Sequence, residues 1–324
     1  MSAVKKIKAP IEEQMKKFEP YFRESLKSNV PLLDIITNYI IRRKGKQMRP
    51  MLVFLSAKLT GEVNDSTYTA AALIELLHTA TLIHDDVVDE SYTRRGFFSI
   101  KALWKSKVAV LVGDFLLSKG LILATEKKEY DLLQIVSIAV KEMAEGELLQ
   151  IEKARRLNIT EEIYFDIIYK KTATLIAACT ASGARSTGAD DKTIFQMKEF
   201  GKFAGIAFQL KDDLFDYEKV NLTGKPAGND IQEKKLTLPL IHALKNATTA
   251  EQRKVLKIIK REKKTQEKIN FIINFVKEKG GIEYTEKSMN EYKSKALDIL
   301  NNFPESEAKQ SLSLLVDYIS ERKK

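Results

Sequence analysis

The chain has 324 residues, of which 44% are hydrophobic, so it can bury a sizeable core. Its 7 Pro and 14 Gly are too few for a β-sandwich or a disordered protein, and they favour long helices. The single cysteine, Cys179, excludes an internal disulfide and a cysteine-based metal site, and it favours a reducing, cytoplasmic location. We therefore predict an all-α protein and interpret residues 1–324 as a single helical domain.

The net charge of +10 raises the question of a polyanionic partner. Lys and Arg alternate with Glu, as in residues 257–268, which is typical of solvated helix faces and predicts no nucleic-acid binding. Residues 1–10 have no apolar core and predict no signal peptide. The apolar tract 109–124 contains Asp114 and Lys119 and is not expected to cross a membrane. An anionic ligand or a membrane surface remains a possible partner.

Two helices are predicted first, over residues 8–29 and from Pro31 onward. The basic stretch 42–50 follows, with Lys46 and Arg49 beside a glycine, and it leads into an apolar helix. Backbone N–H groups, the helix N-terminus and cationic side chains can all point at one anion there. The stretch is either a phosphate-binding turn or an ordinary basic start of a helix.

The next predicted helix carries a polar stripe made of His78, Asp85 and Asp89, which project from nearly the same side. Asp85 and Asp89 are close enough to share a cation, and without one their like charges would destabilise the helix. Asp86 lies between them. His84 falls on the opposite side from His78, so we expect it to pack or to support the site indirectly.

Two adjacent arginines, Arg94 and Arg95, come next, and they either offset the carboxylates or bind a diphosphate. Further helices are predicted over residues 107–125, 131–154, 160–185 and 192–217. The third of these has Thr160 as its N-cap. Within it, Lys171 and Thr172 are either exposed or in contact with a diphosphate.

A second acidic motif lies near the end of the helix at 192–217. Gln209, Asp213 and Asp216 share about one face of this helix, and Asp212 and Asp216 are four residues apart. A single acidic motif of this kind is usually a solvated helix face, but two copies are a poor match for coincidence.

A loop is predicted at residues 221–230, and Lys225 and Lys235 could close it over a ligand as a lid. From Thr237 onward we expect four or so helices that serve packing, separated by Gly280-Gly281 and Pro304.

Together these features are two carboxylate clusters with several lysines and arginines, and without a cysteine or Ser-His nucleophile. Oxygen ligands alone favour Mg²⁺, which keeps water molecules and binds phosphate oxygens. Such a cluster is suited to holding a diphosphate and withdrawing it as a leaving group.

The sequence resembles the trans-isoprenyl diphosphate synthases from about Gly45 to Leu240. The resemblance rests on motifs in family order: Gly45-Lys46-x-x-Arg49-Pro50, the two Asp-rich motifs, Arg94-Arg95-Gly96, Lys171-Thr172, Phe208-Gln209 and Gly224-Lys225-Pro226. One departure is Asn229-Asp230, where Gly-Asp is frequent, and it concerns the geometry of the lid. The family implies the all-α isoprenoid synthase fold, with about ten core helices around a deep central cavity, and usually a homodimer.

The resemblance also implies roles for individual residues. Three Mg²⁺ ions would be coordinated by Asp85, Asp89 and Asp212, with Asp216 as a further ligand candidate; Asp86, Asp213 and Asp216 would act through water or in support. The diphosphate of an allylic primer, farnesyl or geranylgeranyl, would be bound by Arg94, Lys171 and Lys225. Isopentenyl diphosphate would be bound by Lys46, Arg49, His78 and Arg95, and Lys235 is another candidate for substrate binding. Thr172 and Gln209 would stabilise the allylic carbocation.

Product length is expected to depend on the residues four and five positions before Asp85. These are Thr81 and Ala80, both small, where short-chain members of the family typically have Phe or Tyr. A long product is therefore expected, octaprenyl or heptaprenyl diphosphate for a quinone side chain, unless bulky residues such as Phe115 or Met143 close the tunnel earlier.

Several alternatives remain open at this point. The chain could be a short-chain geranylgeranyl or farnesyl synthase, or a non-catalytic partner subunit of a two-component synthase, although both Asp motifs are intact. A terpene cyclase has no need of a second diphosphate site, and Lys46, Arg49 and Arg95 count against it. A transient membrane contact during product release is also left open.

Overall fold

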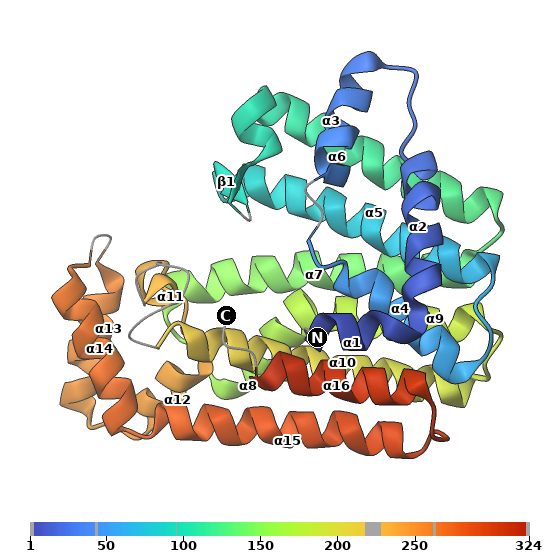
Figure 1. Ribbon diagram of the computed structural model, residues 1–324. Coiled ribbons are helices and arrows are strands. Elements are labelled where there is room, and N and C mark those ends of the chain that lie inside the picture. The colour runs from blue at the N-terminus through green and yellow to red at the C-terminus, as the bar shows by residue number, and fades with distance from the viewer. Residues whose placement is uncertain (1–2, 43–44, 95, 218–227, 262–263, 322–324) are drawn as a thin grey trace. The chain divides into compact units, whose positions relative to one another are not determined.

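The computed structural model describes residues 3–42, 45–94, 96–217, 228–261 and 264–321, except for the side chain of Arg94. Within these residues the fold is all-α, as predicted, with one short β-hairpin in which Thr93 pairs with Phe98 and Arg94 with Phe97 (Figure 1). The chain divides into two compact units, and each is described by itself. Unit 1 comprises Met1–Val140, Ala178–Lys198 and Pro304–Leu312, and unit 2 comprises Lys141–Ala177, Glu199–Phe303 and Ser313–Lys324.

Unit 1 contains the N-terminal helices and the hairpin. Its elements are α1 (Ala3–Lys8), the 3₁₀ turn Ala9–Ile11, α2 (Glu12–Ser25), α3 (Pro31–Arg42), α4 (Met48–Thr60), α5 (Asp65–Val88), β1 (Thr93–Arg94), β2 (Phe97–Phe98), α6 (Ile100–Glu126) and the first part of α7 (Tyr130–Arg156). The single helix predicted over residues 8–29 is wrong in extent. A 3₁₀ turn that contains Pro10 interrupts it, because proline lacks the N–H that an α-helix needs there.

The core of unit 1 is built on α2, α4 and α5. Phe18 stacks on Phe22 at 5.6 Å between ring centroids and meets the edge of Phe54 at 5.8 Å. The α5 helix starts with a capping box, in which the side chain of Asn64 accepts the N–H of Thr67 at 3.1 Å. This cap fixes the start of the helix whose other end carries the first acidic motif.

The α6 helix packs along α5 because glycines remove side chains at the contact. A Cβ at Gly113 would lie 2.1 Å from Nε2 of His84, and one at Gly120 would lie 3.3 Å from Leu73 and Leu77. His84 Nε2 donates to the carbonyl of Val110 at 3.2 Å. The expectation that His84 packs is confirmed.

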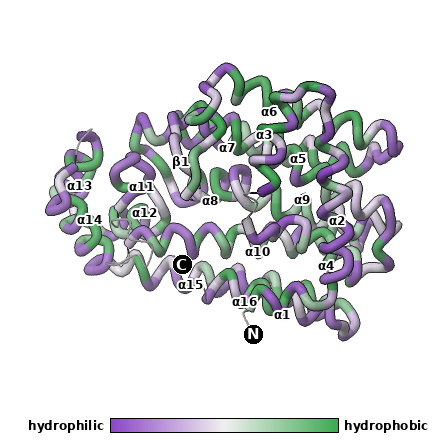
Figure 2. The backbone as a smooth tube through the Cα atoms, turned by 45° about the horizontal axis from the view of Figure 1, so that its top comes forward, coloured by the Kyte–Doolittle hydropathy of each residue, from purple (hydrophilic) through white to green (hydrophobic). Residues whose placement is uncertain are grey.

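By length and composition α6 is apolar enough to cross a membrane, and a third of its most apolar window, 33%, is buried. Asp114 and Lys119, from which the sequence argued against a span, both lie on this helix. Figure 2 shows hydrophobic stretches along both α5 and α6.

Unit 2 contains the remaining helices. Its elements are the rest of α7, α8 (Glu161–Ile168), the π-helix η2 (Tyr169–Ala173), part of α9 (Thr174–Ser186), most of α10 (Asp191–Phe215), α11 (Asn229–Gln232), α12 (Leu238–Lys245), α13 (Thr249–Lys260), α14 (Gln266–Glu278), α15 (Gly281–Asn301) and part of α16 (Glu307–Glu321). Its core gathers Tyr164, Leu210, Leu214, Tyr217, Leu240 and Ile272 with other buried residues.

The structure tests the helices and the N-cap predicted for unit 2. Thr160 is the N-cap of α8, as predicted, and its side chain accepts the N–H of Ile163 at 3.3 Å. The helix predicted over residues 160–185 is confirmed in extent, and residues 169–173 within it form the π-helical turn η2 between α8 and α9. Five helices, rather than four, lie between Leu238 and Glu321 in the described part of the chain.

Candidate active site

The first acidic motif lies at the C-terminal end of α5. The helix ends at Val88, and Asp89 is its C-cap, so Asp85 and Asp86 lie in the last turn. Asp86 is buried, Asp85 is half-buried and Asp89 is exposed. This last turn contains no basic residue.

The second acidic motif has the same position on its own helix. Asp212 and Asp213 lie in the last turn of α10, which ends at Phe215, and Asp216 follows directly. This turn also lacks a basic residue. A carboxylate at the negative end of a helix dipole is unfavourable by about 0.3–1 kcal/mol, and neighbouring carboxylates add repulsion. Both helix ends therefore favour a bound cation.

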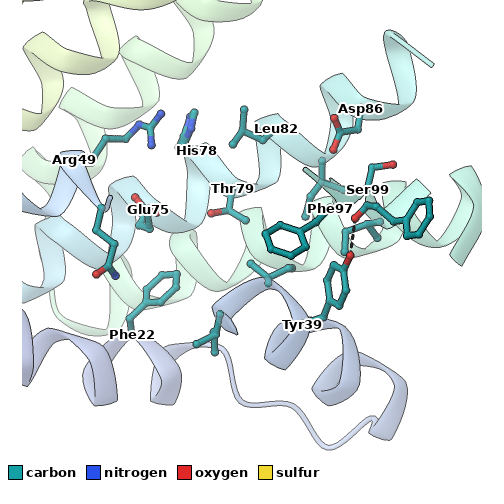
Figure 3. Close-up of a pocket in the computed structure, with 16 residues that line it drawn as sticks. Phe22, Tyr39, Arg49, Glu75, His78, Thr79, Leu82, Asp86, Phe97 and Ser99 are labelled. Carbon is teal, nitrogen blue, oxygen red and sulfur yellow. Dashed lines mark hydrogen bonds between the residues drawn. The ribbon is translucent and has the colours of Figure 1, made fainter. Parts of the chain in front are cut away.

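A pocket in unit 1 lies beside the first motif and holds three of the predicted site residues (Figure 3). It has about 850 Å³ of empty space and is lined by Arg49, His78 and Asp86 together with apolar side chains. Arg49 is in the first turn of α4, where the positive end of the helix dipole favours an anion, and exposed Lys46 comes shortly before it. This arrangement supports the phosphate-binding interpretation of the basic stretch.

The structure does not describe the side chains of three predicted basic residues, which are Arg94, Arg95 and Lys225. Arg94 belongs to the hairpin strand β1, and nothing is described of its side chain. Arg95 and Lys225 lie outside the described residues, as does most of the predicted lid. Their roles stay predictions.

A second pocket, in unit 2, gathers four predicted residues at one place. It has about 700 Å³ of empty space, and Lys171, Thr172, Gln209 and Lys235 all line it. They come from η2, from α10 and from the segment after α11. Sequence reasoning expected these residues to share a site, and the structure brings them together within this unit.

A hydrogen-bond chain connects this pocket to the second acidic motif. The Thr172 hydroxyl donates to Gln209 Oε1 at 2.9 Å, and Gln209 Nε2 donates to Asp213 Oδ1 at 2.8 Å. On its other side Asp213 accepts the Tyr164 hydroxyl at 2.5 Å. Burial, followed by the neighbouring charge of Asp230, raises the pKa of the Asp213 carboxyl to about 7. Both carboxylate oxygens of Asp213 thus accept hydrogen bonds from protein side chains, which agrees with a supporting role.

Asp216 binds the backbone at the start of α11. Its carboxylate accepts the N–H groups of Asn229 at 2.8 Å and Asp230 at 3.1 Å. Burial and the charge of Asp216 raise the pKa of Asp230 to about 6. Asp212 is half-buried at the same helix end and remains the member of this motif best placed to meet a ligand.

Lys171 is presented by the π-helix and held by α7. Its ammonium pairs with the Glu147 carboxylate at 2.5 Å and donates to Gln150 at 3.4 Å. A Cβ at Gly146 would lie 2.8 Å from the Lys171 N atom, so only glycine lets α7 approach this closely. On the other side Gly205 of α10 serves the same purpose, since its Cβ would lie 2.6 Å from the Ala173 Cα. Single π-turns of this kind are frequent at functional sites.

Sequence reasoning missed several polar residues of these pockets. Gln150, Tyr164 and Asp230 line the pocket in unit 2, Glu147 pairs with Lys171, and Glu75 lines the pocket in unit 1. Each lies in an amphipathic helix or a turn, where a polar residue carries no distinct signal. Only Asp230 stood next to a recognised motif.

The fit of a metal ion can be tested on the residues themselves. Among the described residues, no three His, Cys, Asp or Glu side chains converge closely enough to form a metal site. The ligand candidates are pairs of oxygen donors at two helix ends, Asp85 with Asp89 and Asp212 with Asp216, and this donor set fits Mg²⁺ supplemented by water and phosphate oxygens. The two motifs belong to different units, and each is described within its own unit.

The two residues expected to control product length differ in exposure. Ala80 is fully buried, between the close approaches of α6 at Gly113 and Gly120 along α5. Thr81 is half-buried, and its hydroxyl donates to the carbonyl of His78 at 2.8 Å. Cys179 is buried, and burial raises its thiol pKa to about 12, so little of it is the reactive thiolate at neutral pH.

Comparison with known proteins places this geometry in a family. The polyprenyl synthetase family model matches residues 30–276. The all-trans-nonaprenyl-diphosphate synthase (geranyl-diphosphate specific) of Rhodobacter capsulatus is 37% identical over 94% of both chains. The octaprenyl diphosphate synthase of Escherichia coli is 36% identical over 89% of this chain and 90% of its own. Heptaprenyl diphosphate synthase component 2 of Bacillus subtilis is 34% identical over 94% and 87%, respectively.

Solved structures agree over nearly the whole chain. A decaprenyl diphosphate synthase from Rhodobacter capsulatus has a TM-score of 0.93 at 34% identity, covering 99% of both chains. A polyprenyl synthase from Caulobacter crescentus, complexed with calcium and isoprenyl diphosphate, has a TM-score of 0.89 at 33% identity, covering 99% of this chain and 98% of its own. A geranylgeranyl pyrophosphate synthase from Bacteroides thetaiotaomicron has a TM-score of 0.84 at 39% identity, covering 99% and 100%. The fold and the site thus define a prenyltransferase with the isoprenoid synthase fold. The chain belongs to the polyprenyl synthetase family.

Proposed function

We propose that the protein condenses isopentenyl diphosphate onto an allylic diphosphate, farnesyl or geranylgeranyl, to give a long all-trans polyprenyl diphosphate. The observation that carries this proposal is the pocket of unit 2, in which Lys171, Thr172, Gln209 and Lys235 adjoin the second acidic helix end. This set offers cations for a diphosphate and neutral dipoles for a carbocation, and no nucleophile is needed. The relatives at 36% and 37% identity are an octaprenyl and a nonaprenyl diphosphate synthase, which supports a long product.

The basic residues would bind the diphosphate, and the acidic residues would hold the metal ions. The Lys171 ammonium, with Lys225 and Arg94, would bind the allylic diphosphate and favour its departure as an anion. Bound Mg²⁺, three ions by family resemblance, would neutralise charge on the leaving diphosphate, with Asp85, Asp89, Asp212 and Asp216 as the residues that hold it. The calcium in the Caulobacter crescentus structure supports a divalent ion.

The orientation of the Thr172 and Gln209 side chains would favour formation of the carbon–carbon bond. As the allylic C–O bond breaks, the Thr172 hydroxyl and the Gln209 amide can direct their negative ends toward the cation. Their mutual hydrogen bond at 2.9 Å fixes both dipoles before the substrate ionises. The isopentenyl double bond then attacks the allylic carbon, and loss of a proton to the released pyrophosphate completes the product.

The second substrate would be held in unit 1. Lys46, Arg49, His78 and Arg95 are the candidates for binding isopentenyl diphosphate, and Arg49 and His78 share one pocket there. Gripping the diphosphate at the start of α4 combines two cations with the positive end of that helix. A quinone side chain is the proposed use of the product, and the cytoplasm is the proposed location.

A homodimer is the proposed assembly. Exposed apolar side chains lie along one face of α6 and the start of α7: Leu103, Val110, Leu111, Leu121, Ile122 and Ile138. Asp114 and Ser118 lie on the same exposed side of α6. A face of mixed apolar and polar groups suits a second protein copy better than lipid, in which Asp114 would have to be buried.

The test is a product assay with purified protein, Mg²⁺, farnesyl diphosphate and labelled isopentenyl diphosphate, resolved by chain length. A ladder that ends at heptaprenyl or octaprenyl diphosphate is the expected result. Product that stops at geranylgeranyl diphosphate would keep the reaction and overturn the long product, in line with the Bacteroides thetaiotaomicron structure at 39% identity. Without incorporation, the chain would be a non-catalytic subunit, a possibility that the name of the Bacillus subtilis component keeps open.

A further inference from the structure

Unit 1 exposes a cluster of aromatic and aliphatic side chains to which the proposed reaction assigns no role. The cluster, here named the α3–hairpin patch, consists of Ile35 on α3, Tyr92 before the hairpin, and Phe97 and Phe98 in β2. Their exposed fractions are 59%, 65%, 46% and 61%. Side chains of this size are usually covered, and a contiguous exposed group of them marks an interaction site.

The patch is one surface because its two parts are tied together. The Tyr39 hydroxyl of α3 donates to the carbonyl of Phe98 at 2.6 Å, and the Tyr39 ring meets the edge of Trp104 at 5.4 Å. A groove lined by Ile35, Tyr39, Phe97 and Trp104 runs between these elements. Figure 3 shows Tyr39 reaching from α3 to the hairpin, with Phe97 beside it.

The hairpin itself is held in place at its base. The Ser99 N–H donates to the carbonyl of Tyr92 at 2.9 Å, and the Ser99 hydroxyl donates to the carbonyl of Ser91 at 2.8 Å. The same hydroxyl caps α6 by accepting the N–H of Ala102 at 3.1 Å. The exposed rings are thus presented on a fixed turn.

Basic side chains lie beside the patch, and the exposed acidic residues Asp89 and Glu90 come shortly before Tyr92. Arg42 lies at the exposed end of α3 and lines the groove, and Lys46 is exposed shortly after it. The Lys101 ammonium lies 5.2 Å from the centre of the Tyr92 ring. Asp34, at the start of α3, is the exposed acidic residue on this helix.

We propose that the α3–hairpin patch docks the protein onto an anionic lipid bilayer. Aromatic rings and an amphipathic helix insert at the level of the lipid headgroups, and nearby Lys and Arg side chains are attracted to anionic lipids. A second copy of the chain is the alternative occupant, and the molar mass of the patch variants distinguishes it from a bilayer. The patch also adjoins the pocket that contains Arg49 and His78, since Tyr39, Phe97 and Phe98 line that pocket too.

The purpose of docking rests on the proposed function. A polyprenyl diphosphate has a long apolar tail and an anionic head, so it belongs at a bilayer surface, and a docked enzyme would release it there directly. The docking itself requires no turnover, so it can be measured separately from the reaction.

The experiment measures flotation of the full-length protein with vesicles of phosphatidylcholine, alone or mixed with phosphatidylglycerol, in the absence of substrate. We expect binding to the anionic vesicles, weakening as salt is raised. The double variant Phe97→Ser/Phe98→Ser should bind at least about tenfold more weakly, because two rings are lost from the headgroup region. Phe195→Ser is the matched control, since Phe195 is exposed to 62% on α10 and lies outside the patch.

Charge is tested in parallel. Arg42→Glu should weaken binding about tenfold on anionic vesicles and leave neutral ones unaffected, whereas Arg253→Glu, on exposed α13, should bind like the wild type. Ile35→Ser is a second apolar variant that leaves the hairpin intact. Circular dichroism confirms folding for each variant.

Three results would overturn the proposal. These are no flotation with anionic vesicles, flotation unchanged in the patch variants, and a molar mass by light scattering that falls in the double variant. The last would make the patch a subunit interface. Intact flotation with no prenyl transfer would overturn the proposed function and leave docking in place.

Discussion

Ala80 offers the sharpest residue-scale test of product length. It is fully buried on α5, and α6 comes close on both sides of it, at Gly113 and Gly120. The sequence predicts that a bulky side chain at this position blocks the growing chain. Ala80→Phe is expected to shorten the product toward geranylgeranyl diphosphate and to lower stability by about 1–3 kcal/mol through overpacking.

The measurement is chain-length resolution of the Ala80→Phe product, with Ala124→Phe as control. Ala124 is also fully buried, on α6, so the control carries the same overpacking at a place unrelated to the acidic motif. A product of unchanged length in Ala80→Phe would disprove the tunnel along this face of α5. A shortened product in the control would attribute the effect to general destabilisation.

Tyr164 is a residue that the sequence did not single out and the structure places in the site. Its hydroxyl donates to Asp213 at 2.5 Å, and both side chains are buried. Tyr164→Phe removes one of the donors to a buried carboxylate, so we expect a loss of about 1.5–3 kcal/mol in the free energy of unfolding. Urea denaturation measures it, with Tyr130→Phe at an exposed tyrosine of α7 as control.

The same variant should also raise the Mg²⁺ concentration needed for half-maximal activity, because Asp213 would turn away from its fixed position beside Asp212. Restored activity at high Mg²⁺ would support a positioning role. Loss of stability with an unchanged Mg²⁺ requirement would reduce Tyr164 to a packing residue.

At this scale the sequence was informative where charge and spacing are unusual. Lys171, Thr172 and Gln209 were identified from motifs, and they share a pocket with Lys235. Glu147, which pairs with Lys171, looked like any polar residue of an amphipathic helix, because its partner is 24 positions away in the chain. Contacts between distant segments have no local signal and therefore need the structure.

At the scale of elements, the π-helix η2 depends on two glycines that let neighbouring helices approach. Gly146 of α7 and Gly205 of α10 both lie where a Cβ would be within 2.8 Å of the η2 backbone or its Cβ atoms. Gly146→Ala and Gly205→Ala should displace Lys171 and Thr172. A displacement on the order of 1 Å can lower kcat about tenfold to a hundredfold.

Steady-state kinetics checks this prediction, with Glu145→Ala as the control at the exposed neighbouring position of α7. Alanine has a higher helix propensity than glycine by about 1 kcal/mol, so a stability close to that of the wild type is compatible with a large kinetic effect. Wild-type kcat in both glycine variants would show that η2 tolerates the shift.

The cap of α13 makes a pH-dependent contribution. Glu251 accepts the N–H of Thr248 at 2.8 Å and pairs with Lys279 at 2.9 Å. The Lys279 hydrogen bond, then those of Thr248, lower the pKa of Glu251 from 4.5 to about 2. Because the folded pKa lies below the unfolded one, the stabilisation is complete above pH 4.5 and is lost as the pH falls toward 2.

The expected result is a melting temperature of Glu251→Gln that is below that of the wild type at pH 7, with a difference that shrinks between pH 4.5 and pH 2. Glu286→Gln, at an exposed position of α15, is the control. A difference that stays constant with pH would attribute the effect to the amide substitution rather than to charge.

The helix boundaries show which features of the fold local sequence patterns can predict. Periodicity identified α3, α7 and α10 and their approximate limits, and a side-chain rule identified Thr160 as a cap. It did not reveal the π-helical turn at η2, because residues 160–185 are continuously helical in pattern. The π-turn forms where α7 and α10 pack against it through glycines, and this tertiary cause leaves the local pattern unchanged.

On the scale of the whole molecule, we propose that the apolar face of α6 forms the subunit interface. Leu111, Leu121 and Ile122 are about half exposed, although the opposite face of the helix is packed against α5. Exposed leucines along a long helix are costly in water and are expected to be covered by an isologous copy of the same face. Near the middle of this face His84 Nε2 lies 3.5 Å from the Asp114 carboxylate, a polar pair between the apolar ends.

We therefore expect Leu111→Glu/Leu121→Glu to convert the protein from dimer to monomer. Two carboxylates on each copy would be buried against apolar side chains, and the cost of desolvating them exceeds what a homodimer face of this kind can offset. Light scattering coupled to size exclusion measures the molar mass, with Leu314→Glu on α16 as control, since that leucine is also exposed. A wild-type protein that is monomeric, or a variant that remains dimeric, would contradict the assignment of α6.

A monomeric variant that still elongates prenyl chains would show that each copy has a complete site. Loss of activity on dissociation would instead tie the metal-binding end of α5 to the dimer, because α6 packs along α5 as far as His84, one residue before Asp85.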